Sequence, residues 1–210
     1  MKKIKLIILG LAFTLVYEVS NAQYVDIMPY YGYQFAAHVD AYYFNSAARF
    51  RIKPAANYGL ELDVVIPHND ISITASFTNT STYVTYQENF QAEEKLFDAT
   101  QQYWMFGVSR EIDADQIRPF FGVILGWTTV NPDDVTLQNL TKFTVGLRGG
   151  VKYFISDRIG IFARARLLLP VQWAGAGVWF GSGSGVTLSA GTSIITGDVG
   201  GGIIISLGEK

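Results

Sequence analysis

The run Thr144-Val-Gly-Leu-Arg-Gly-Gly-Val-Lys-Tyr-Phe154 decides the fold, because its residues alternate between two unlike kinds. A period of two is that of a β-strand, whose successive side chains point to opposite faces. One face of the predicted strand is therefore apolar, and the other carries cations beside glycine. The first face holds Phe143, Val145, Leu147, Val151 and Tyr153, and the second holds Thr144, Gly146, Arg148, Gly150 and Lys152.

The same alternation recurs along the chain and predicts eight strands in all. Besides the run above, they cover residues 24–35, 58–66, 70–79, 101–112, 117–130, 159–169 and 197–207. The connections are alternately long (36–57, 80–100, 131–142, 170–196) and short (67–69, 113–116, 156–158). This order predicts an all-β fold, an eight-stranded antiparallel up-and-down transmembrane β-barrel with both chain ends on the side of the short turns. Phe50 and Ile52 either extend the second strand across Pro54 or form a short extra strand in the first loop.

The N-terminus has the three parts of a secretory signal peptide. Lys2, Lys3 and Lys5 precede an apolar stretch of 11 residues at 6–16, and Ser20-Asn-Ala22 supplies the small residues of a cleavage site. A spanning helix needs about 20 apolar residues, so the stretch is too short for a transmembrane anchor. The sequence predicts a signal peptide at residues 1–22 and a barrel domain at residues 23–210.

Composition narrows the class of protein further. The precursor has 16 basic and 18 acidic residues, and removal of three lysines and Glu18 with the signal leaves 13 and 17, a net charge of −4. This charge argues against a nucleic-acid partner. Cysteine is absent, so disulfides do not hold this exported chain together. If the mature protein is integral to a membrane it must be a closed barrel, because open sheet edges cannot face lipid.

Four short motifs, in this order over most of the mature chain, resemble the small outer-membrane β-barrel proteins of the OmpA/OmpX-like and porin-like superfamily. They are Ile27-Met-Pro-Tyr-Tyr-Gly-Tyr33, Asn57-Tyr-Gly-Leu60, Arg118-Pro-Phe-Phe-Gly122 and Gly149-Gly-Val-Lys-Tyr-Phe-Ile-Ser-Asp-Arg158. The resemblance implies the outer membrane of a Gram-negative bacterium, with lipid and the outer-membrane assembly machinery as partners, and no single shared activity. One departure is the end Ser206-Leu-Gly-Glu-Lys210, where many such barrels carry an aromatic residue.

Charges on the inward faces form the strongest candidate site. An eight-stranded barrel is only wide enough inside for side chains, so charges there must pair or stay hydrated. One interpretation is a salt-bridge network that fills the lumen, and the other is a gate or an anion-attracting constriction. Bulky inward residues favour the filled form: Met28, Tyr103, Met105 and Phe162. The predicted network consists of Glu61, Asp63, Arg148, Lys152, Arg164 and Arg166.

Catalysis, metal binding and cofactor binding find little support. The only histidines are His38, in the first long loop, and His68, in a short turn. They are too few for a metal site and cannot be placed with a serine and an acid as a triad. Gly181-Ser-Gly-Ser-Gly185 has glycine where a nucleophile elbow needs serine. The acidic pairs Glu93-Glu94 and Asp133-Asp134 are predicted to be solvated loop charges.

The sequence therefore predicts a non-enzymatic, integral outer-membrane barrel with a side-chain-filled lumen. Its role is structural, or adhesive through an extracellular ligand of its loops. The alternative is a small porin-like or hydrophobic-ligand transport barrel. A soluble lipocalin-like binder shares the strand number, but the sorted loop lengths and the outward apolar stripe argue against it.

Overall fold

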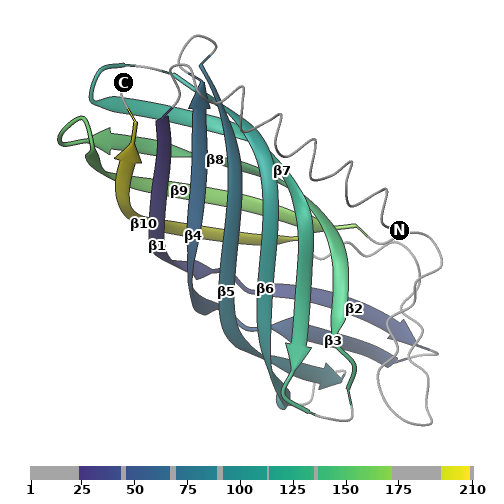
Figure 1. Cartoon of the computed structure of the whole chain (residues 1–210). Coiled ribbons are helices and arrows are strands. Elements are labelled where there is room, and N and C mark those ends of the chain that lie inside the picture. The colour runs from purple at the N-terminus through teal and green to yellow at the C-terminus, as the bar shows by residue number, and fades with distance from the viewer. Residues whose placement is uncertain are drawn as a thin grey trace, which may run out of the picture.

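The computed structural model describes residues 24–43, 46–66, 70–88, 92–112, 114–134, 137–171 and 195–208, and its strands form one antiparallel sheet (Figure 1). None of these residues belongs to a helix long and apolar enough to cross a membrane. The strands are β1 (Tyr24–Gln34), β2 (Ala37–Tyr43), β3 (Ser46–Ile52), β4 (Ala55–Ile66), β5 (Ile71–Glu88), β6 (Glu94–Glu111), β7 (Ile117–Pro132), β8 (Leu140–Phe154), β9 (Ile159–Pro170) and β10 (Thr196–Leu207).

Eight of these strands close into a barrel, as predicted. β1 pairs with both β4 and β10, β5 pairs with β6, and the other neighbours follow in order from β6 to β10. Tyr24 and Leu207 lie at the same end, where β6 connects to β7 and β8 to β9 through short turns. Asp115 in the first of these turns has φ 56°, a left-handed conformation that Asp tolerates. We call this the short-turn end and the opposite one the long-loop end.

β5 and β6 are much longer than predicted, and the expected long loop at residues 80–100 is wrong. Residues 81–86 pair with residues 94–100, with one extra residue, Leu96, forming a bulge. The stretch 80–86 is rich in threonine and tyrosine, which suit strands, but it lacks the apolar alternation of a lipid-facing wall. These residues lie beyond the part of the wall whose outer face is apolar. The apolar–polar alternation that identified the other strands is therefore missing here.

The expected loop at 36–57 is also wrong, because it contains a hairpin of β2 and β3. Phe50 and Ile52 form the extra strand that was one of the two alternatives, and β3 pairs with residues 84–88 of β5. The ring of Phe50 lies 5.2 Å from that of Tyr86, its direct partner in the ladder. We call β2, β3, residues 81–88 of β5 and residues 94–98 of β6 the sheet extension; Figure 1 shows β2 and β3 beside the ends of β5 and β6.

The two faces of the barrel wall differ as the alternation predicts. Outward residues such as Trp104, Phe121 and Leu147 are 51%, 69% and 54% exposed, whereas inward Glu61 and Lys152 are fully buried. Inward bulky residues form two apolar clusters, one around Met28, Tyr30 and Phe162 and one around Tyr103, Met105 and Ile124. Glycine makes room for some of them: a Cβ on Gly59 would lie 2.4 Å from the Tyr30 hydroxyl, and one on Gly150 would lie 2.7 Å from the Phe120 ring. The lumen is therefore packed with side chains.

Candidate functional site

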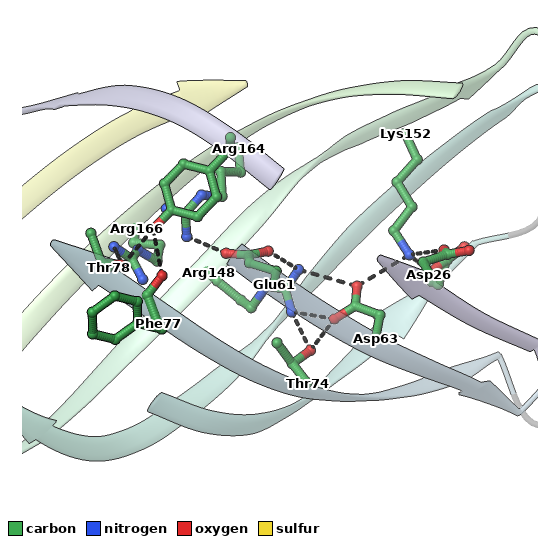
Figure 2. Close-up of polar contacts among 12 residues, drawn as sticks. Asp26, Glu61, Asp63, Thr74, Phe77, Thr78, Arg148, Lys152, Arg164 and Arg166 are labelled. Carbon is green, nitrogen blue, oxygen red and sulfur yellow. Dashed lines mark hydrogen bonds and ion pairs between the residues drawn. The ribbon is translucent and has the colours of Figure 1, made fainter. Parts of the chain in front are cut away.

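Among the residues that the structure describes, nine charged side chains lie buried inside the barrel and form a network along its axis. Figure 2 labels all of them except Glu111 and Asp198. Each occupies an inward position of its strand, so the strand alternation alone directs all of them into the lumen. Buried charges are costly unless they are paired and hydrogen-bonded, and each of these lies within 4.0 Å of a charge of opposite sign. The carboxylates are Asp26, Glu61, Asp63, Glu111 and Asp198, and the cations are Arg148, Lys152, Arg164 and Arg166.

Lys152 gathers three carboxylates near the short-turn end. Its Nζ lies 2.8 Å from Asp26 Oδ2, 2.7 Å from Glu111 Oε2 and 3.1 Å from Asp63 Oδ2. The Ser206 hydroxyl donates a further hydrogen bond to Asp26. One ammonium group thus holds together β1, β4, β6 and β8 across the lumen.

Arg148 continues the network in the middle of the barrel. Its Nη1 lies 3.0 Å from Asp63 Oδ1 and its Nη2 lies 3.1 Å from Glu61 Oε2. Thr74 donates to Asp63 at 2.6 Å, and Arg164 donates to the other oxygen of Glu61. Asp63 therefore links the lysine to the arginines, and Glu61 links two arginines to each other, as the dashed lines in Figure 2 show.

Arg166 forms the part of the network nearest the long-loop end. Its Nε and Nη2 lie 3.0 and 2.5 Å from the two oxygens of Asp198, and Nη2 also donates to Thr78 at 2.8 Å. Arg166 and Asp198 are direct cross-strand partners on β9 and β10. This pair is bidentate, the strongest geometry for an arginine and a carboxylate.

Aromatic rings cover the cations. The guanidinium carbon of Arg164 lies 3.8 Å from the centre of the Tyr30 ring, and that of Arg148 lies 4.6 Å from the Phe120 ring. Near the short-turn end, Arg118 lies 5.0 Å from the Phe154 ring and donates to the Tyr24 hydroxyl. Cation–π contacts of this kind strengthen where water is excluded, so the rings both fill the lumen and stabilise its charges.

Neutral polar side chains line the lumen on the long-loop side of the charges. Gln34 donates to Gln101 at 2.6 Å, and Thr80 and Tyr103 each donate to Gln34 at 3.2 Å. Gln34, Thr80, Gln101 and Tyr103 are all buried. The network thus passes into an uncharged, hydrogen-bonded layer on its long-loop side.

The structure brings the predicted residues together only in part. Glu61 and Asp63 contact Arg148, Arg164 and Lys152, whereas Arg166 contacts Asp198. Three network members were missed in the sequence: Asp26, Glu111 and Asp198. Their inward positions were readable from the alternation, and Glu111 shares the face of Tyr103 and Ser109. Whether the network is structural or acts as a gate stays a prediction.

A second, exposed group of charges lies beside the sheet extension, around Glu93. Its carboxylate lies 2.6 Å from Lys53 Nζ and 3.5 Å from Arg51 Nη1, and accepts a hydrogen bond from Thr85 at 2.5 Å. These hydrogen bonds, that from Lys53 foremost, hold the pKa of Glu93 below its ordinary value. Glu93, Asp133 and Asp134 are exposed, as predicted. The sequence did not indicate that Glu93 is also paired with Lys53 and Arg51.

The candidate chemistry that was set aside in the sequence finds no new support. Among the residues that the structure describes, no group of three or more His, Cys, Asp or Glu could hold a metal ion. The side chain of His38, as well as His68 and residues 181–185, lies outside the described part. A groove of about 1020 Å³ is lined mainly by outward residues, among them Tyr31, Ala163 and Gly201, and its lining also includes the inward residue Arg164.

Solved structures of other proteins are similar to this fold, although no sequence match is found. No protein-family model matches this chain, and no curated protein matches its sequence. The outer membrane protein OprG from Pseudomonas aeruginosa aligns with a TM-score of 0.61 at 10% identity, over 89% of this chain and 96% of that one. Neisserial surface protein A aligns with a TM-score of 0.53 at 14% identity, over 87% and 96%.

The chain shares the fold of small outer-membrane β-barrels. At these identities the likeness concerns the fold alone. The activity must be argued from the chain's own residues.

Proposed function

We propose that this chain is an integral outer-membrane barrel, exported through a cleaved signal peptide, whose lumen is closed by its own ion pairs. It acts at the long-loop end, where the sheet extension and the loops form a structural or adhesive surface for a ligand outside the cell. It carries out no catalysis. Outer-membrane lipid surrounds it, and the outer-membrane assembly machinery inserts it.

The inverted burial of the barrel wall carries this proposal. Phe121 is 69% exposed while Lys152, on the neighbouring strand, is 0% exposed. In water, lysine is almost never fully buried and large exposed apolar surfaces mark contact with another phase or partner. A lipid environment reverses both preferences, which gives the apolar-out, polar-in pattern of outer-membrane barrels.

Cell fractionation tests the location. The protein should sediment with outer membranes and resist alkaline carbonate extraction, and the mature N-terminus, read by mass spectrometry, should be Gln23. Recovery of a soluble periplasmic monomer would contradict the proposal, and an intact residue 1–22 segment would contradict the signal peptide alone.

The role of the sheet extension is tested by removing it. A variant in which residues 37–52 are replaced by a short Gly-Ser linker keeps every strand of the barrel. It should still fold and reach the outer membrane but lose adhesion of whole cells to a surface that the wild type binds. The matched control replaces residues 133–139, between β7 and β8, with the same linker. Undiminished adhesion of the 37–52 variant to every surface that the wild type binds would exclude the extension as the binding element.

A further inference from the structure

Three arginines lie side by side between the middle of the lumen and the long-loop end. Arg148 and Arg166 are direct ladder partners on β8 and β9, and Arg164 precedes Arg166 by two residues on the same face. Each is at most 4% exposed. Figure 2 shows Arg164 and Arg166 on one side of Glu61 and Arg148 beside it.

These arginines have more N–H donors than their neighbours accept. Within the described part of the chain, no acceptor is present for Arg148 Nε, for Arg164 Nε and Nη2, or for Arg166 Nη1. Arg164 Nη2 comes closest, at 4.0 Å from Asp198 Oδ1, which is beyond hydrogen-bond distance. A buried donor that lacks an acceptor destabilises a protein, and more so when it is charged. The cluster is therefore complete only with a further acceptor.

The balance of charge in this part of the lumen favours an anion as that acceptor. The three arginines face two carboxylates, Glu61 and Asp198, while Asp63 is shared between Arg148 and Lys152. Cations are thus in excess on the side of the lumen that leads through neutral side chains to the long-loop end. An anion arriving from that end meets Arg166 and Arg164 before it meets the carboxylates around Lys152.

Two glycines of the barrel wall separate Arg164 from a second polar group without a partner among the described residues. In the ladder, Gly32 and Gly200 are the residues between Asn57 and Arg164. The Asn57 amide lies over Gly32, where a Cβ would come within 2.6 Å of its Oδ1. Both polar atoms of this buried amide lack a partner within the described residues. Its NH₂ group is a neutral donor on the far side of two glycines from the Arg164 guanidinium.

We propose that Arg148, Arg164 and Arg166, with the Asn57 amide, form a binding site for a small inorganic anion of the size of chloride. A halide accepts hydrogen bonds from any direction and so suits unpartnered donors that are supplied by several strands. A phosphate is a poor fit, because an eight-stranded lumen holds little beyond its own side chains. The site is independent of the role proposed for the sheet extension, and its failure would leave that role untouched.

Chloride binding to the full-length mature barrel, refolded in a neutral detergent, tests the site. Sodium chloride is titrated against sodium gluconate at constant ionic strength, while binding is followed by calorimetry and stability by the urea midpoint. The wild type should be stabilised by chloride and not by gluconate. Equal effects of the two salts would show a general salt effect only and would overturn the proposal.

Variants with opposite expected effects sharpen the test. Arg164→Gln should weaken chloride binding by about tenfold, the change that corresponds to one charge-assisted hydrogen bond. Glu61→Gln removes a competing carboxylate and should tighten it. Arg110→Gln, in an exposed pair near the short-turn end, is the matched control and should bind as the wild type does.

Asn57→Ala keeps the proposal falsifiable if Arg164→Gln does not fold. Among the described residues the Asn57 side chain forms no hydrogen bond, so the substitution breaks none of those that hold the barrel together. The variant should fold and bind chloride several-fold more weakly. Chloride affinity equal to wild type in both Asn57→Ala and Glu61→Gln would exclude a site at this place.

Discussion

The lumen network and the Glu93 group consist of the same side-chain types in two different surroundings. In the lumen, Lys152 pairs with Asp26, and both side chains are 0% exposed. In the Glu93 group, Lys53 pairs with Glu93, and their side chains are 20% and 26% exposed. Breaking a buried pair costs about 3–5 kcal/mol because a charge is left without a partner. An exposed pair contributes about 0–1 kcal/mol because water replaces the lost contact. Pairing of opposite charges is therefore required for folding in the lumen, whereas in the exposed Glu93 group it adds little to stability.

Lys152 is where this comparison predicts the largest effect. Lys152→Met keeps the length of the side chain but leaves Asp26, Asp63 and Glu111 facing one another without their central cation. We expect the free energy of unfolding to fall by about 3–5 kcal/mol, as for a broken buried pair. Urea unfolding of the barrel in lipid vesicles, followed by tryptophan fluorescence, measures this change.

Two controls separate charge from packing at this position. Lys152→Arg keeps the charge and should lose much less stability than Lys152→Met. Lys95→Met removes a cation from a pair whose side chains are both 52% exposed, and should cost about 0–1 kcal/mol. If Lys152→Met and Lys95→Met lose the same stability, burial is not what distinguishes the two regions.

Leu147 tests the same comparison on the outer surface, where a cation has neither a partner nor water. Its neighbour Arg148 is held by two carboxylates in the lumen, but Leu147 points outward and is 54% exposed. Leu147→Arg should cost about 2–4 kcal/mol near the bilayer midplane. Gln138→Arg, at an exposed site between β7 and β8, should be nearly neutral in the same urea titration. Equal tolerance of both variants would contradict the facing of β8.

Glu93 should show the smallest effect, and one that depends on pH. Its folded-state pKa is lowered, so its contribution is present above the ordinary carboxyl pKa of 4.5 and is lost as pH falls through the lower folded value. Glu93→Gln should slightly speed amide hydrogen exchange in the β3–β5 ladder at neutral pH. The difference from wild type should vanish well below pH 4.5. A difference that persists in acid would mean that the charge of Glu93 is not its cause.

The barrel could be predicted from the sequence because each wall strand has two faces in different surroundings, with lipid outside and the polar lumen inside. β8 and β9 carry this contrast along most of their length, so their positions and facing follow from the alternation alone. β2, β3 and the upper parts of β5 and β6 lie beyond the apolar band. There the pattern fades while hydrogen bonding continues, so the alternation predicts loops where the structure has strands.

The lumen site was predictable in composition but not in pairing. Alternation places Glu61, Asp63 and Arg148 inside, and it equally places Asp26, Glu111 and Asp198 there. Which charges meet depends on the height that the strand register gives each one. Arg166 is level with Asp198 on the adjacent strand, so it pairs there instead of reaching across the barrel. The position of a residue along the barrel axis depends on how all the strands pair in the closed ring. The sequence of one strand does not reveal it.

Conductance in a planar lipid bilayer tests most directly whether the lumen is closed by its own charges. The purified wild-type barrel should show little steady conductance. Glu61→Ala combined with Asp63→Ala frees Arg148, Arg164 and Lys152 from these partners and should raise channel activity or lower stability by about 3–5 kcal/mol. A large, stable wild-type conductance would contradict the closed lumen and favour a porin. A double variant equal to the wild type in both conductance and unfolding would show that these pairs do not hold the lumen shut.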